Sequence, residues 1–141
     1  MPLKMSRDEL QTFLVKAFPQ VSDDFEVLTV NDAQITVRMA VSDRNLRPGG
    51  TVSGPSMFSL ADVSIYLAIL SRIGPKALAV TTNCSIDFMR KPESGRALVA
   101  TARLLKLGRV LAVGDVLIYS EGGGQPVARA GLTYSIPPER A

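Results

Sequence analysis

One acidic residue stands in the most apolar stretch of the chain, where an unpaired charge is costly. Asp62 has Leu60 and Val63 beside it. On a helix, Phe58 and Tyr66 would lie one turn away, and no basic residue lies within that distance. A carboxylate buried there must be hydrogen-bonded, protonated or open to a solvated pocket. Two interpretations follow: a structural aspartate bonded to backbone or to a strand arginine, or a carboxylate that faces a ligand as base or nucleophile.

The start of the same segment offers a hydrogen-bond donor. Ser53 and Gly54 have the character of helix caps, and Pro55 that of a first-turn residue. Backbone N–H groups at a helix N-terminus carry the positive end of the helix dipole and can polarise a carbonyl group. Proline has no N–H, and glycine lets a ligand approach closely. The predicted donor is therefore the Gly54 amide, with Ser56 as a further group.

The spacing of these two groups predicts an oligomer. Gly54 and Asp62 are eight residues apart, which is about 12 Å along a helix at 1.5 Å per residue. A nucleophile and an oxyanion donor must both lie about 3 Å from one carbonyl group. Two helices related by a two-fold axis could meet this requirement, each supplying the amide to one site and the acid to the other. If both residues are catalytic, the protein is at least a dimer.

The composition excludes several other chemistries. There is no histidine, which removes Ser-His-Asp and Cys-His machinery and most catalytic zinc sites. The single cysteine, Cys84, lies in an apolar strand-like run, which favours a buried structural thiol over a nucleophile; with no disulfide partner, it also favours a reducing, cytoplasmic location. A net charge of +3 suits anionic ligands, but scattered basic residues and few aromatics argue against nucleic acid.

The element that must position Asp62 is a long helix. It is predicted from residue 56 to about residue 73, where Gly74-Pro75 ends it. Apolar residues occur on every face, so we expect a helix buried on all sides. A membrane span is the rival interpretation, but it would place Asp62 near its middle at a cost of about 2.5–3.5 kcal/mol. We therefore expect a core helix and no membrane association.

The rest of the chain reads as strands joined by short turns. An N-terminal amphipathic helix within residues 1–20 begins with a capping box at Ser6 and Glu9. Two strands flank a turn between Phe25 and Val41, and a polar loop follows over residues 42–52. Further strands are expected over residues 77–89, 97–106, 110–119 and 127–136. The predicted fold is a single α+β domain over residues 1–141: an antiparallel sheet with one long helix on its face, and a loose tail over residues 137–141.

Six short pieces of sequence follow one another in a characteristic order. They are Gly50-Thr51, Ser53-Gly54-Pro55, the acid Asp62, Val80-Thr81-Thr82-Asn83, Ile86 to Pro92, and Gly108-Arg109. In order and spacing they resemble the hotdog-fold acyl-CoA thioesterases, in particular the phenylacetate-degradation (PaaI-like) branch. The resemblance covers about residues 25–135. It implies a sheet wrapped around a central helix, a homodimer with shared sites, and often a dimer of dimers.

The resemblance also implies roles for individual residues. Gly54 matches the amide that polarises the thioester carbonyl, and Asp62 matches the acid that activates water or attacks directly. Thr81 stands where the family often has a hydroxyl near the acid, although a purely structural threonine fits the strand equally well. Phe58 and Tyr66 would lie near the acyl chain.

Other positions match the family less closely or allow two interpretations. Ser53 and Pro55 replace the usual histidine and second glycine, and Asn45 stands two positions from the place of a usual asparagine or glutamine, which Arg47 occupies. Ser53 and Asn45 are candidate substrate-binding residues by this resemblance. The remaining candidates for the phosphates of coenzyme A are basic residues that could equally be solvated strand ends. They are Arg90, Lys91 and Arg109.

Together these observations predict an acyl-CoA thioesterase that releases free acid and CoA from a short, medium or aromatic acyl-CoA. Asp62 would be base or nucleophile and Gly54 the electrophilic donor. No metal or added cofactor is required, since coenzyme A enters as part of the substrate. A non-catalytic acyl-CoA-binding protein of the same fold is the alternative. A dehydratase of the same fold is disfavoured, because the sites of those enzymes resemble ones built on histidine, which this chain lacks.

Overall fold

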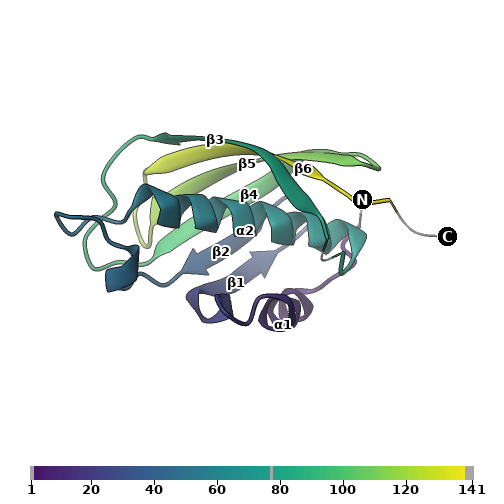
Figure 1. Ribbon diagram of the computed structural model, residues 1–141, viewed down its shortest axis with the longest axis horizontal. Coiled ribbons are helices and arrows are strands. Elements are labelled where there is room, and N and C mark those ends of the chain that lie inside the picture. The colour runs from purple at the N-terminus through teal and green to yellow at the C-terminus, as the bar shows by residue number, and fades with distance from the viewer. Residues whose placement is uncertain (1, 77, 139–141) are drawn as a thin grey trace.

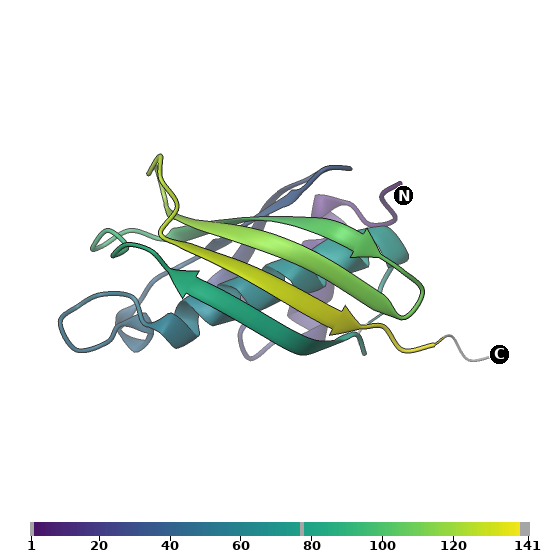
Figure 2. The same cartoon turned by 90° about the horizontal axis from the view of Figure 1, so that it is seen from above.

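A long helix crosses one face of a curved antiparallel sheet (Figures 1 and 2). The computed structural model describes residues 2–76 and 78–138. The helix is α2 (Gly54–Ile73), and a shorter helix, α1 (Arg7–Ala17), packs beside the sheet edge. Within the described residues the sheet has six strands in the order β1-β2-β4-β5-β6-β3. The predicted α+β architecture, a hotdog fold with one central helix and a short N-terminal helix, is confirmed.

The strands lie close to their predicted ranges. They are β1 (Phe25–Val30), β2 (Ile35–Met39), β3 (Val80–Phe88), β4 (Leu98–Leu107), β5 (Leu111–Ser120) and β6 (Ala128–Ser135), with short 3-10 turns at Ser22–Asp24 and Asp43–Asn45. All neighbouring strands are antiparallel, and β1 and β3 form the two edges. The predicted loose tail falls partly on residues 139–141, which lie outside the described residues.

Ser6 and Ser53 are the N-caps of the two described helices, as predicted, whereas Gly54, also predicted as a cap, is the first residue of α2. The Ser6 hydroxyl accepts the Glu9 N–H at 3.2 Å, and the Glu9 carboxylate accepts the Ser6 N–H at 3.0 Å. In α2 the Ser53 hydroxyl accepts the Ser56 N–H at 3.3 Å. The helix ends at Gly74, whose φ of 90° is a conformation that favours glycine. Each helix is thus bounded by residues that satisfy its free backbone groups.

Small residues on the inner face of the sheet let α2 pack closely. Buried alanines on β4, β5 and β6 face the helix, and Gly114 is the tightest point. A Cβ atom added there would lie 2.5 Å from Cδ1 of Ile65 and 2.8 Å from the backbone oxygen of Arg103. By length and composition α2 could cross a membrane, but 61% of its most apolar window is buried inside the fold. It is the core helix of this domain.

The expectation that α2 is buried on all sides is wrong for its first half. Pro55, Phe58 and Ser59 are exposed, and Asp62 and Val63 are half-buried. The sheet curves round the other faces of the helix and stops at β3, so nothing in the described chain covers this strip. The first half of α2 therefore exposes a strip of apolar and acidic side chains beside the open edge of the sheet at β3.

Candidate active site

Two hydroxyl groups hold the Asp62 carboxylate. Thr81 Oγ1 donates to Oδ1 of Asp62 at 2.5 Å, and the Tyr134 hydroxyl donates to the same oxygen at 2.6 Å. The Tyr134 hydroxyl also lies 3.0 Å from the backbone oxygen of Asp62. Within the described chain no hydrogen bond reaches Oδ2. The carboxylate is therefore fixed through one oxygen, and the other is open.

The sheet register explains this arrangement. Thr81 on β3 and Tyr134 on β6 are directly paired residues of neighbouring strands, so their side chains emerge together toward α2. A bulge between Thr81 and Asn83 shifts the strand register just beyond the site. Such bulges re-aim side chains and are frequent beside functional sites. Two strands and the helix thus meet at one carboxylate.

Burial controls the protonation of the groups around Asp62. The phenol of Tyr134 is 3% exposed, and burial first, then the hydrogen bond to Asp62, raises its pKa far above the ordinary value. Burial, followed by the negative charge of Asp62, also raises the pKa of Cys84. Both groups therefore stay protonated near neutral pH, Tyr134 as a donor and Cys84 as a thiol.

The start of α2 presents the predicted free donor. No acceptor within the described chain binds the Gly54 N–H. A Cβ atom at Gly54 would lie 3.1 Å from Cζ of Phe88, so a side chain here would press on that ring. Polar groups brace the surrounding turn: the Ser53 N–H donates to the backbone oxygen of Asn45 at 2.7 Å, and Asn45 Nδ2 donates to Ser56 Oγ at 3.2 Å. Ser53 and Asn45 thus shape the helix start.

A cavity of 510 Å³ opens beside Gly54. Its walls come from the loop before α2, the first turn of α2 and the end of β3; the lining residues are Arg47, Pro48, Gly49, Thr51, Val52, Gly54, Met57, Phe88, Met89, Arg90, Lys91 and Pro92. Arg90 is braced by a hydrogen bond from Nη1 to the backbone oxygen of Pro126 at 2.5 Å. Apolar and basic side chains both line this cavity, which suits a ligand with an apolar part and an anionic part.

The other predicted residues lie elsewhere. Arg109 borders a second cavity, of 730 Å³, beyond the end of α2, together with Lys4 and Lys76. Phe58 is 38% exposed on the open strip of α2, whereas Tyr66 is 5% exposed and packs edge-to-face on Phe18 with ring centroids 5.6 Å apart. One chain thus brings Gly54 together with Arg90 and Lys91, and Asp62 with Thr81, but keeps these two groups apart.

Tyr134 is a site residue that was not predicted from the sequence. One signal could have found it: β6 alternates buried and less buried residues, and Tyr134 has the same parity as Ala128, Ala130 and Leu132. A phenol on the inner face of a strand needs a hydrogen-bond partner, which an acid in the central helix can supply. No group of three or more potential metal-ligating side chains occurs among the residues described.

Comparison with known proteins identifies the class. The Thioesterase superfamily profile matches residues 49–127, and the chain belongs to that family and is a thioester hydrolase of the PaaI-like hotdog type. A Silicibacter sp. TM1040 crystal structure, described as a candidate thioesterase, shares 59% identity and a TM-score of 0.92, covering 98% of this chain and 96% of that one.

Two curated relatives carry more specific names. Acyl-coenzyme A thioesterase PaaI of Escherichia coli is 29% identical over 68% of this chain and 66% of its own length. Mouse acyl-coenzyme A thioesterase 13 is 26% identical over 83% of both chains.

Proposed function

We propose that this chain hydrolyses acyl-CoA thioesters to free acid and CoA, using Asp62 of one subunit and the Gly54 amide of another. The observation that carries the proposal is that one helix presents two groups without a partner among the described residues: Oδ2 of Asp62 and, beside a 510 Å³ cavity, the Gly54 N–H. The names of the PaaI and thioesterase 13 relatives support CoA thioesters as the substrate class.

The chemistry assigns one role to each group. The Gly54 N–H donates to the thioester carbonyl oxygen and stabilises the negative charge that develops there. Asp62 either takes a proton from the water that attacks the carbonyl carbon or attacks that carbon itself. The C–S bond then breaks, and the CoA thiolate leaves and takes up a proton. In the second route water hydrolyses the resulting anhydride.

Subunit pairing through β3 would unite the two groups. Thr81, near the start of β3, contacts Asp62, and Phe88, at its end, packs near Gly54. Antiparallel pairing of two β3 edges about a two-fold axis therefore sets the Asp62 end of one chain beside the Gly54 end of the other. The exposed edge strand and the uncovered strip of α2 support this homodimer. A dimer of dimers through the outer face of the sheet is the proposed full assembly.

The same pairing would join the candidate binding groups for CoA. The cavity with Arg109, Lys4 and Lys76 lies just before the start of β3, whereas Arg90 and Lys91 lie just after its end. In an antiparallel dimer these two basic regions would face each other across the interface. The acyl group would then lie on the apolar wall near Phe88. A cytoplasmic location is part of the proposal, because Cys84 is a free thiol.

The test is a panel of short, medium, long and aromatic acyl-CoA thioesters, with released CoA detected by a thiol-reactive dye. We expect turnover with at least one acyl group, and light scattering at micromolar concentration should give a dimer or tetramer. Single turnover in H₂¹⁸O tests the second route: if water attacks the Asp62 carbonyl carbon of the anhydride, the acid keeps an enzyme oxygen and the label enters Asp62. A monomer would contradict the shared site.

The non-catalytic binder is favoured by one observation. Pro55 has no N–H, so the first turn of α2 offers fewer donors than the usual family motif. Calorimetry in low and high salt distinguishes this function: salt-weakened binding of acyl-CoA, with no CoA released from any thioester, would support the binder.

A further inference from the structure

The two hydroxyls on Asp62 leave one carboxylate oxygen available. Thr81 and Tyr134 both donate to Oδ1, and the described residues make no hydrogen bond to Oδ2. We infer that Thr81 and Tyr134 are positioning residues that hold Asp62 by Oδ1 and make Oδ2 the reacting oxygen. This inference rests on the proposed thioester hydrolysis and deepens it.

Hydroxyl donors suit this task better than a basic partner. An arginine commonly binds both oxygens of a carboxylate in a fork and compensates its charge. Two neutral donors on one oxygen hold the carboxylate without placing a positive charge beside it, and they leave the second oxygen open. Their strand pairing, at Thr81 on β3 and Tyr134 on β6, makes the arrangement rigid.

The two hydrogen bonds from Thr81 and Tyr134 to Oδ1 of Asp62 are called the clamp below. Four variants test it: Thr81→Val, Tyr134→Phe, their combination, and Thr81→Ser. Loss of a hydrogen bond to a charged group should lower kcat by about tenfold or more in the first two variants, with KM unchanged. Thr81→Ser keeps the hydroxyl and should retain kcat within about twofold of the wild type. Circular dichroism and thermal unfolding verify the fold.

The outcomes separate the clamp from the proposed function. If Asp62→Asn is inactive but folded Thr81→Val and Tyr134→Phe keep full kcat, the clamp is wrong and the function stands. If Asp62→Asn is fully active, the role of Asp62 is wrong. Should the double variant fail to fold, the single variants decide, because each preserves side-chain shape.

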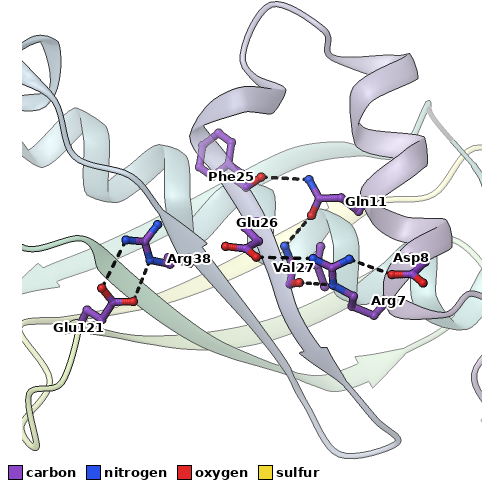
Figure 3. Close-up of polar contacts among 8 residues, drawn as sticks. All are labelled: Arg7, Asp8, Gln11, Phe25, Glu26, Val27, Arg38 and Glu121. Atoms are coloured by element: carbon purple, nitrogen blue, oxygen red, sulfur yellow. Dashed lines mark hydrogen bonds and ion pairs between the residues drawn. The ribbon is translucent and has the colours of Figure 1, made fainter.

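An independent observation concerns the opposite edge of the sheet. In Figure 3, side chains of α1 reach the outer backbone groups of β1. Gln11 Nε2 donates to the Phe25 carbonyl at 3.1 Å, and Gln11 Oε1 accepts the Val27 N–H at 2.7 Å. Arg7 Nε donates to the Val27 carbonyl at 2.7 Å, and the Phe25 N–H donates to the backbone oxygen of Ser22. All four outward groups of Phe25 and Val27 are thereby bonded.

The two edge strands differ in their cover and not in their regularity. Each has a bulge, between Val27 and Thr29 in β1 and between Thr81 and Asn83 in β3. A covering helix is a device that stops an edge strand from pairing with another chain, and only β1 has one in the described part of the chain. By contrast, no side chain in the described part of the molecule bonds a main-chain group of β3. One edge is closed and the other is open.

We propose that α1 caps the β1 edge and confines strand-to-strand association between copies of this chain to β3. A dimer paired through β3 carries a β1 edge at each end of its continuous sheet. If these ends were open, dimers could pair β1 to β1 and extend without limit, since such contacts do not close. Gln11 offers β1 one donor and one acceptor, as the backbone of a neighbouring strand would, so it occupies the position that a strand of a second copy would take.

The test uses Arg7→Met/Gln11→Met, which keeps side-chain length and helix propensity while removing the bonds. The matched control is Thr12→Ala/Lys16→Ala on the exposed side of α1. We expect the Val27 amide to exchange at least about tenfold faster. Sedimentation velocity should show species larger than the wild-type assembly that grow with protein concentration, and the control should show neither change.

A folded variant with faster Val27 exchange and an unchanged size distribution would overturn the edge-cap proposal. If the double variant does not fold, Gln11→Met alone provides the same measurement, because Leu10 and Leu14 still anchor α1 in the core. An unchanged exchange rate in a folded variant would also contradict the proposal, since the bonds would then not protect the edge.

Discussion

The two chemically important points on α2 lie in opposite surroundings. Asp62, in the middle of the helix, is held by hydrogen bonds from side chains of two strands and is half-buried. Gly54, at the helix start, offers its amide beside a cavity whose lining includes basic side chains. These surroundings suit different tasks. A hydrogen-bonded carboxylate is held in a fixed position, whereas an exposed amide can donate to a bound substrate. Their separation along one helix means that each is half of a site.

The largest expected effect comes from removing the carboxylate. Asp62→Asn is nearly isosteric, and thioester hydrolysis should fall at least about a hundredfold, because the amide cannot act as base or nucleophile. The measurement is CoA release under saturating substrate, with Asp23→Asn, on an exposed residue, as the matched control. Retention of full activity, or loss of the fold, would make Asp62 structural.

Removal of the amide proton tests the other half. Gly54→Pro suits the first helical position, and the extended backbone of Ser53, with φ −73° and ψ 152°, accepts a following proline. Activity should fall by about 10²-fold, as for other oxyanion donors. Gly54→Ala keeps the N–H and should lose less, through crowding of Phe88.

Mixed subunits make this prediction sharper. When inactive Asp62→Asn and Gly54→Pro chains are refolded together in equal amounts, half of the dimers are hybrids, and one of the two sites in each hybrid is intact. Activity should therefore return to about a quarter of the wild type. No recovery in hybrids verified by mass spectrometry would show that both groups act within one chain or that the pairing is different.

Much of this contrast could be predicted from the sequence. Asp62 stands out because a charge interrupts an apolar helix, and Gly54 because caps mark a helix start. Its parity along the strand could have placed Tyr134 on the inner face of β6, but not against Asp62 in particular, since that contact depends on how β6 lies over the helix. The exposed strip at Phe58 was unpredictable for a related reason: an apolar surface looks the same whether its own sheet or another subunit covers it.

The two basic regions should show a smaller effect. Arg90→Gln/Lys91→Gln and, separately, Arg109→Gln should each raise KM several-fold, with a weaker salt dependence than the wild type and little change in kcat. Lys16→Gln, on the exposed side of α1, is the control. If only one region affects KM, the two regions do not bind the same substrate, and the proposed facing of the regions across the dimer is wrong.

The smallest effect is expected at Cys84, whose thiol is influenced by the nearby Asp62. Burial and the charge of Asp62 raise the pKa of this thiol, so little thiolate exists near neutral pH and it is a poor nucleophile. Cys84→Ala should therefore keep kcat within about twofold. Alkylation by iodoacetamide at pH 8 should be slower than that of an unperturbed thiol, because the raised pKa lowers the reactive fraction. If Cys84→Ala instead abolishes turnover in a folded protein, Asp62 is not the base or nucleophile. The Cys84 thiol would then have that role, and the two-part site on α2 would be wrong.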